Sequence, residues 1–319
     1  MTAAGKGDRT GPSWMTRFWA VVRYELLWNI RKKKFLGVVV VAFALVTLSL
    51  ALPVILSSTI GESVGANPDY VVTSSIGSFG FFLFALVTAM NSISGEFESG
   101  TIVPLLTKPV SRTMVFLGKL FAAFTIILVT YTVLFVYTVI GGTVVYGAQN
   151  NLHLVPLTML GSILSTFVWI AMVLAVASIS KSSLIAAIGG LGIFLALLIS
   201  APIVSAFSSQ AWVLTYVPGN GASGTLGAAG PINVTTTQSV ATGTDGIGAN
   251  LGTFVLHPEA NVTFYRLGII APGLPPETIA LYTEPLSLVL VRSIIVALVY
   301  IAVFLLVAWF FFKRAQVLE

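Results

Sequence analysis

The chain has 319 residues, of which 56% are hydrophobic and only 8% are charged, and its formal net charge is +5. A soluble globular protein carries about 25% charged residues, so this composition predicts an integral membrane protein. Because the sequence contains no cysteine and only two histidines, it excludes disulfides and thiol chemistry and argues against a histidine-based metal centre.

The first predicted element is an amphipathic helix over residues 13–34. Apolar side chains recur there at helical spacing, at Met15, Phe18, Trp19, Val22, Leu26 and Ile30. Arg17, Arg23, Arg31 and the Lys32–Lys34 cluster supply positive charge on the same segment. This pattern predicts a helix that lies in the headgroup region of the inner leaflet, and it also serves as a basic topology anchor.

Charge-free stretches predict six transmembrane helices, since about 20 apolar residues cross the roughly 30 Å hydrocarbon core. The predicted spans lie in the gap between Lys34 and Glu62, at residues 70–91, in two halves of 120–180, at 183–206 and at 286–312. The polar break at residues 147–153 divides the two halves of the long apolar run. We therefore predict an all-α membrane protein with six transmembrane helices.

The distribution of basic residues predicts the orientation. With both termini in the cytoplasm, 14 of the 16 Lys and Arg residues lie inside, and only Arg266 and Arg292 lie outside. The positive charge is thus a topology signal, and we expect no nucleic-acid partner. The predicted location is the plasma membrane, as a multi-pass protein in the lipid bilayer.

The segment between the last two spans, residues 207–285, is rich in Gly, Thr, Ser, Asn and Pro. Residues 221–230 indicate a loop, whereas residues 253–256 and 262–265 could be strands. The predicted organisation is a cytoplasmic segment 1–34, five spans over 35–206 with a cytoplasmic loop at 92–119, an exterior β-containing segment 207–285, and the last span with its tail at 286–319.

The sequence shows no catalytic or nucleotide-binding motif. A GxxxxGK[ST] phosphate loop, a GxSxG elbow, an HExxH zinc site and a dinucleotide fingerprint are all missing. The spans hold almost no ionisable residues; Arg292 either reaches the outer interface or faces a cavity between helices. We expect no enzyme activity and no cofactor in this chain, so energy for transport would enter from another subunit.

The loop at residues 92–119 carries the most specific pattern. The string GEFESGTIVPLLTKPVSRTMVFLGK resembles the loop after the second span of type-2 ABC transporter permeases. The matching positions are Glu96, Glu98, Gly100, Thr101, Leu105, Leu106, Pro109, Ser111, Arg112, Gly118 and Lys119. Residues 23–26 and 310–317 also agree, except that Ala315 stands where the family often has Asp.

This resemblance implies a dimer, with a second copy or a related permease, and separate ATP-binding subunits that hold ATP and Mg²⁺. The loop would be a coupling helix in which Leu105 and Leu106 enter a groove of the ATPase while Glu96, Glu98 and Arg112 form charge pairs at its rim. In the alternative interpretation, the two glutamates cap the loop and Ser111 caps the third span. Export is the commoner role in the family.

Two other functions remain open at this point. An ion-coupled carrier or channel would need polar or charged groups near mid-membrane, which the charge-free spans do not provide. A membrane scaffold that transports nothing would act through its exterior segment.

Overall fold

The computed structural model describes residues 13–31, 33–59, 61, 64–75, 77–90, 92, 94–98, 111–227, 238–267 and 278–314. The helices are α1 (Trp14–Arg31), α2 (Lys33–Thr59), α3 (Tyr70–Thr73), α4 (Gly77–Ala89), α5 (Ser94–Glu98), α7 (Arg112–Tyr146), α8 (Val155–Ser180), α9 (Ser183–Phe207), α10 (Ile247–Leu256) and α11 (Leu286–Arg314). Short 3₁₀ helices are η1 (Leu152–Leu154), η2 (Ala211–Tyr216) and η3 (Thr244–Gly246). The strands are β1 (Ser223–Leu226), β2 (Ser239–Ala241), β3 (Asn261–Leu267) and β4 (Thr278–Pro285).

The chain is a mostly helical, multi-pass membrane protein. Five helical stretches among the described residues are long and apolar enough to cross a bilayer: Val39–Thr59, Arg112–Tyr146, Leu152–Ser180, Ser183–Phe207 and Leu286–Arg314. Each contains or overlaps a span predicted from the sequence. The predicted break at residues 147–153 falls between α7 and α8, where Gly147 has a positive φ of 86°.

The second predicted span is interrupted. The described residues of this span form the single turn of α3 and then α4, and Gly77 begins α4 with a positive φ of 79°. At 1.5 Å per residue, the 13 residues of α4 extend about 20 Å, less than the roughly 30 Å of hydrocarbon. The count of six spans therefore stays a prediction.

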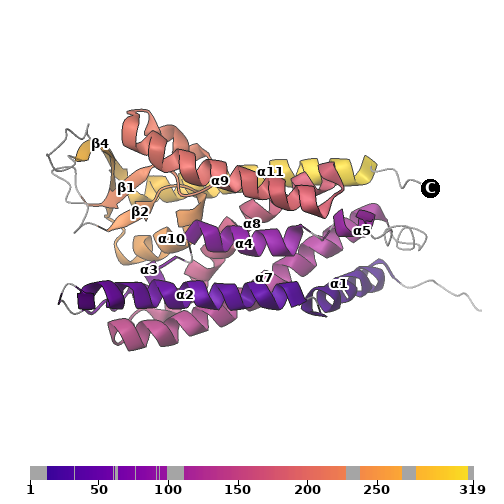
Figure 1. The fold of residues 1–319 in the computed structure, drawn as a ribbon, viewed down its shortest axis with the longest axis horizontal. Coiled ribbons are helices and arrows are strands. Elements are labelled where there is room, and N and C mark those ends of the chain that lie inside the picture. The colour runs from indigo at the N-terminus through magenta and orange to yellow at the C-terminus, as the bar shows by residue number, and fades with distance from the viewer. Residues whose placement is uncertain are drawn as a thin grey trace, which may run out of the picture.

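The two ends of the helix bundle differ. Figure 1 shows the strands and α10 gathered at one end, while α1, α5 and the C-terminal end of α11 lie at the other. We call the first the sheet end. The second is the basic end, because α1 ends in Arg31, α11 ends in Lys313 and Arg314, and Arg112 at the start of α7 bonds to Lys313. α1 and the end of α11 thus lie at the same end of the described structure; the placement of the two termini relative to the membrane stays a prediction.

Helix α8 forms the centre of the bundle. In an apolar stretch of 18 residues along α8, 78% of the residues are buried. In stretches of the same length along α2, α9 and α11, only 17% are buried. Its Trp169 packs edge-on against the rings of Phe82 and Phe194, and the latter two stack at 4.4 Å. The peripheral helices consequently present apolar side chains outward, where lipid replaces water.

The sheet has four antiparallel strands in the order β2-β1-β3-β4. Thr225 pairs with Thr263, which pairs in turn with Thr283, so the register places a row of threonines across three strands. The strand predicted at residues 262–265 is confirmed as part of β3.

Two local predictions in this segment were wrong. Residues 253–256 belong to helix α10, because Gly248 and Gly252 allow that helix to pack directly on neighbouring backbone. Residues 223–226 form strand β1 rather than loop, since the backbone of this glycine-rich segment pairs with β2 and β3.

Candidate functional site

The predicted coupling segment is described only at its two flanks. α5 ends at Glu98 on one side, and Ser111 precedes α7 on the other. Glu96 belongs to α5, whereas the predicted positions Gly100, Thr101, Leu105, Leu106 and Pro109 lie outside the described residues. The flanks show how this segment is attached to the membrane helices.

The first flank is tied to α9 through Glu98. Its Oε1 accepts hydrogen bonds from the backbone N–H of Ser183 at 2.8 Å and from the Ser182 hydroxyl at 3.0 Å, and its Oε2 accepts one from the Ser183 hydroxyl. A carboxylate at a helix N-terminus satisfies unpaired N–H groups and lies at the favourable end of the helix dipole. Glu98 therefore caps α9, which fits the capping interpretation and also fixes α5 to the tight α8–α9 turn.

The second flank is tied to α11. The Ser111 side chain accepts from the N–H of Met114 at 3.2 Å, which confirms it as the N-cap of α7. The Arg112 guanidinium donates to the carbonyl of Lys313 at 2.8 Å, in the last turn of α11, and the rings of Phe116 and Phe312 pack 5.9 Å apart. A cation is well placed at this helix C-terminus. The start of α7 and the end of α11 are thus joined.

A buried ion pair holds α1 against α7. Lys119 Nζ donates to Glu25 Oε1 at 2.6 Å, and the two side chains are 3% and 5% exposed. One residue earlier, Gly118 makes room for α1, because a Cβ there would lie 2.7 Å from Val21 Cγ1. The Gly118–Lys119 step that the resemblance singled out is therefore the docking point of α1.

Glu25 was not among the predicted site residues. The available signal was that Glu25 is the one acidic residue in the basic segment 13–34. An acidic group on an otherwise cationic helix indicates a specific partner, but the sequence did not identify Lys119, 94 residues away.

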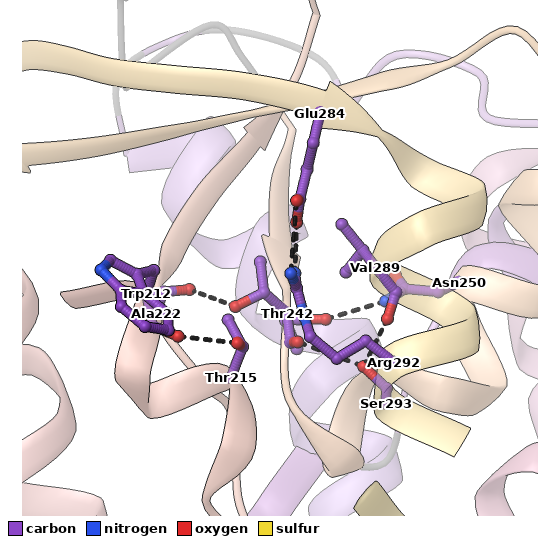
Figure 2. Close-up of polar contacts among 10 residues, drawn as sticks. Trp212, Thr215, Ala222, Thr242, Asn250, Glu284, Val289, Arg292 and Ser293 are labelled. Atoms are coloured by element: carbon purple, nitrogen blue, oxygen red, sulfur yellow. Dashed lines mark hydrogen bonds and ion pairs between the residues drawn. The ribbon is translucent and has the colours of Figure 1, made fainter. Parts of the chain in front are cut away.

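At the sheet end, Arg292 is held by Glu284 of β4 (Figure 2). The guanidinium Nη1 donates to Glu284 Oε2 at 3.2 Å, a second bond joins Nη2 to Oε1, and the Tyr216 ring centroid lies 5.7 Å from Cζ. Burial and the neighbouring Glu284 carboxylate raise the pKa of Tyr282 to about 12, so this hydroxyl stays protonated at neutral pH. Arg292, the ionisable residue predicted in the last span, therefore anchors strand β4 to α11.

A buried turn at Thr244 and Asp245 attaches the strand-containing segment to α8. The Asp245 carboxylate accepts from Trp169 Nε1 at 3.0 Å, and the carbonyl of Thr244 accepts from the Ser165 hydroxyl at 2.7 Å. Figure 2 shows Ser293 of α11 reaching Thr242, whose carbonyl accepts at 3.1 Å. We call the described residues from Ala211 to Pro285 the sheet unit; it rests on α8 and α11. The described residues hold no group of three or more His, Asp or Glu placed to bind a metal ion.

Comparison with protein families decides the identity. The model of the ABC-2 family transporter proteins matches residues 19–317, which is nearly the whole chain. The chain belongs to this family. An ABC-2 permease is a membrane component of an ABC transporter, and it pairs with an ABC ATP-binding subunit. A search of curated proteins found no match.

Proposed function

We propose that this ABC-2 permease forms the membrane path of an exporter as a dimer, and that a separate ATPase docks on residues 92–119. In this proposal the basic end faces the cytoplasm, ATP and Mg²⁺ bind in the ATPase alone, and the protein works in the plasma membrane. The partner permease is a second copy or a related chain.

The attachment of the two flanks carries the proposal. Glu98 fixes the segment to the start of α9, and Arg112 fixes it to the end of α11. Lys119 extends the connection through α7 to α1. A displacement imposed on residues 99–110 would therefore act on α1, α7, α9 and α11 together.

The assembly test measures how much of an ABC ATP-binding subunit co-purifies with this permease from its native membranes. We expect Glu96→Lys and Leu105→Asp each to reduce co-purification of the ATPase by about tenfold, because a reversed charge at the rim and a charge in the groove both oppose docking. Glu259→Lys is the matched control, since Glu259 is exposed in the sheet unit at the opposite end.

Equal co-purification of all three variants would place the docking surface elsewhere. Failure to recover any ATPase with the wild-type chain would remove the transporter proposal and favour the carrier or scaffold alternatives.

A further inference from the structure

A cavity of about 540 Å³ lies between α9 and the sheet unit. We call it the sheet-end cavity. It is lined from the membrane helices by residues such as Phe194, Leu197 and Pro202, and from the sheet unit by residues such as Asn220, Ser223 and Asn250. Its size falls in the range of sites that hold small molecules.

The two walls of the cavity differ in polarity. α8 and α9 contribute aromatic and aliphatic surface from Trp169, Phe194 and Leu197, whereas β1, β2 and α10 contribute hydroxyl, amide and backbone groups. None of the described residues that line it is Asp, Glu, Lys or Arg. Because an ion transferred from water to this site would meet no countercharge, the cavity favours an uncharged molecule with one apolar and one polar part.

The polar wall is rich in hydrogen-bond acceptors. The Thr253 hydroxyl of α10 donates its proton to the carbonyl of Ala249 at 2.9 Å. Asn250 donates from its amide nitrogen to the carbonyl of Ala241 at 2.8 Å (Figure 2). The oxygens of these side chains keep their lone pairs as acceptors, so a ligand that donates from hydroxyl groups fits this wall.

The apolar wall connects the cavity with the lipid-facing side of α9. Leu198 lines the cavity and is 40% exposed, and Ile199 and Ile203 on the same helix are also exposed. Pro202, inside α9, also lines the cavity and adds apolar ring surface to this wall. An acyl chain lying along α9 would carry a hydroxylated head toward the polar wall.

From this geometry we propose that the sheet-end cavity binds a neutral amphiphile with a hydroxylated head, of the monoacylglycerol class. The inference goes beyond the transport proposal, because binding is defined by this chain alone and is measured without ATP or an ATPase.

The test measures binding of tritiated 1-monodecanoylglycerol to the full chain in lipid nanodiscs. We expect saturable binding above that of empty nanodiscs. Ala201→Phe on α9 and Ala249→Phe on α10 fill the cavity from opposite walls and should each weaken binding by at least about tenfold. Leu184→Phe, at an exposed residue in the first turn of α9 and outside the cavity lining, is the matched control and should stay within about twofold of wild type.

Three competitors define the ligand chemistry. Decyl phosphate tests whether a charged head binds, and methyl decanoate tests whether the hydroxyl groups are needed. Glycerol tests whether a soluble polyol without an acyl chain occupies the site. None should displace the tracer at concentrations where unlabelled monodecanoylglycerol does. Displacement by any of them at equal potency would overturn the assigned class.

Uptake equal to that of empty nanodiscs would overturn the site itself, as would wild-type affinity in both filled variants. Should a filled variant fail to fold, a fluorescence experiment tests the site instead. It uses a chain in which every tryptophan except Trp169 is replaced by Phe, because Trp169 lines the cavity. A terminally brominated monodecanoylglycerol is added, and quenching of the Trp169 fluorescence is measured. Saturable quenching supports the site, and quenching that rises linearly with the probe refutes it.

Discussion

The pair of Glu25 and Lys119 joins two helices that meet at the basic end. Both charges are almost fully withdrawn from solvent, and each lies in direct contact with the other. A buried pair of this kind adds little net stability over an apolar pair, but an unmatched buried charge is costly. The pair therefore specifies where α1 packs on α7.

Single replacements at this pair should be strongly destabilising. We expect Glu25→Met or Lys119→Met to lower the free energy of unfolding by about 3–5 kcal/mol, because each removes one member of a buried ion pair and leaves the opposite charge buried. The double variant should recover most of that loss. Denaturant unfolding in detergent micelles measures the cycle, with Arg23→Met on the exposed face of α1 as control, expected within about 0.5 kcal/mol of wild type. A Lys119→Met chain as stable as the control would contradict the coupling.

At the scale of elements, α10 packs on the membrane helices through glycine. A Cβ on Gly161 of α8 would lie 2.7 Å from the Cα of Gly248, and a Cβ on Gly252 would lie 2.1 Å from the carbonyl oxygen of Val72. Backbone meets backbone at both places, so no side chain fits between α10 and its neighbours. Small residues of this kind allow close helix contact where burial of apolar surface supplies no driving force.

Substitution of Gly252 should therefore push α10 away from α3. Gly→Ala at an open helical position stabilises by about 0.5–1 kcal/mol, and Gly192→Ala on α9, with no atom within 4 Å of its added Cβ, should follow that rule. Gly252→Ala should instead destabilise by about 1–3 kcal/mol, because a backbone carbonyl cannot move aside easily. The free energies of unfolding of the two variants check this prediction; equal values would show that α10 is not closely held.

The sequence predicted these elements unevenly. Long apolar runs predicted six spans, of which five are helices long and apolar enough to cross a bilayer, and Ser111 was recognised as a cap, because membrane thickness and helix capping act locally. Helix α10 and strand β1 were missed, because glycine has no strong preference of its own and the contacts that select these conformations come from distant residues. For the same reason the roles of Glu98 and Arg112 needed the structure, which shows their partners on α9 and α11.

Across the whole molecule, α8 and α11 link the two ends. Trp169 and Ser293 hold the sheet unit at one end, and at the other Arg112 binds the last turn of α11. Movement of the segment 92–119 has a continuous path of packed helices to the sheet unit. In the proposed docking, Glu98 and Arg112 attach the segment to α9 and α11 rather than to the ATPase, so binding and transmission would rest on different residues.

Loss of the Glu98 and Arg112 attachments should weaken the transmission of movement from the segment 92–119 to the sheet end, while the permease and the ATPase stay associated. We expect the double variant Glu98→Gln, Arg112→Gln to co-purify with the ATPase as wild type does. Spin labels on cysteines introduced at Val144 and Leu288, exposed at the sheet ends of α7 and α11, report their separation by pulsed electron resonance. The absence of native cysteine removes background labelling. The ATP-induced change in that distance should fall by at least about half in the double variant, because helices released from the segment no longer follow it.

Glu259→Gln serves as control at the opposite end. A change of wild-type size in the double variant would show that movement reaches the sheet end by another route.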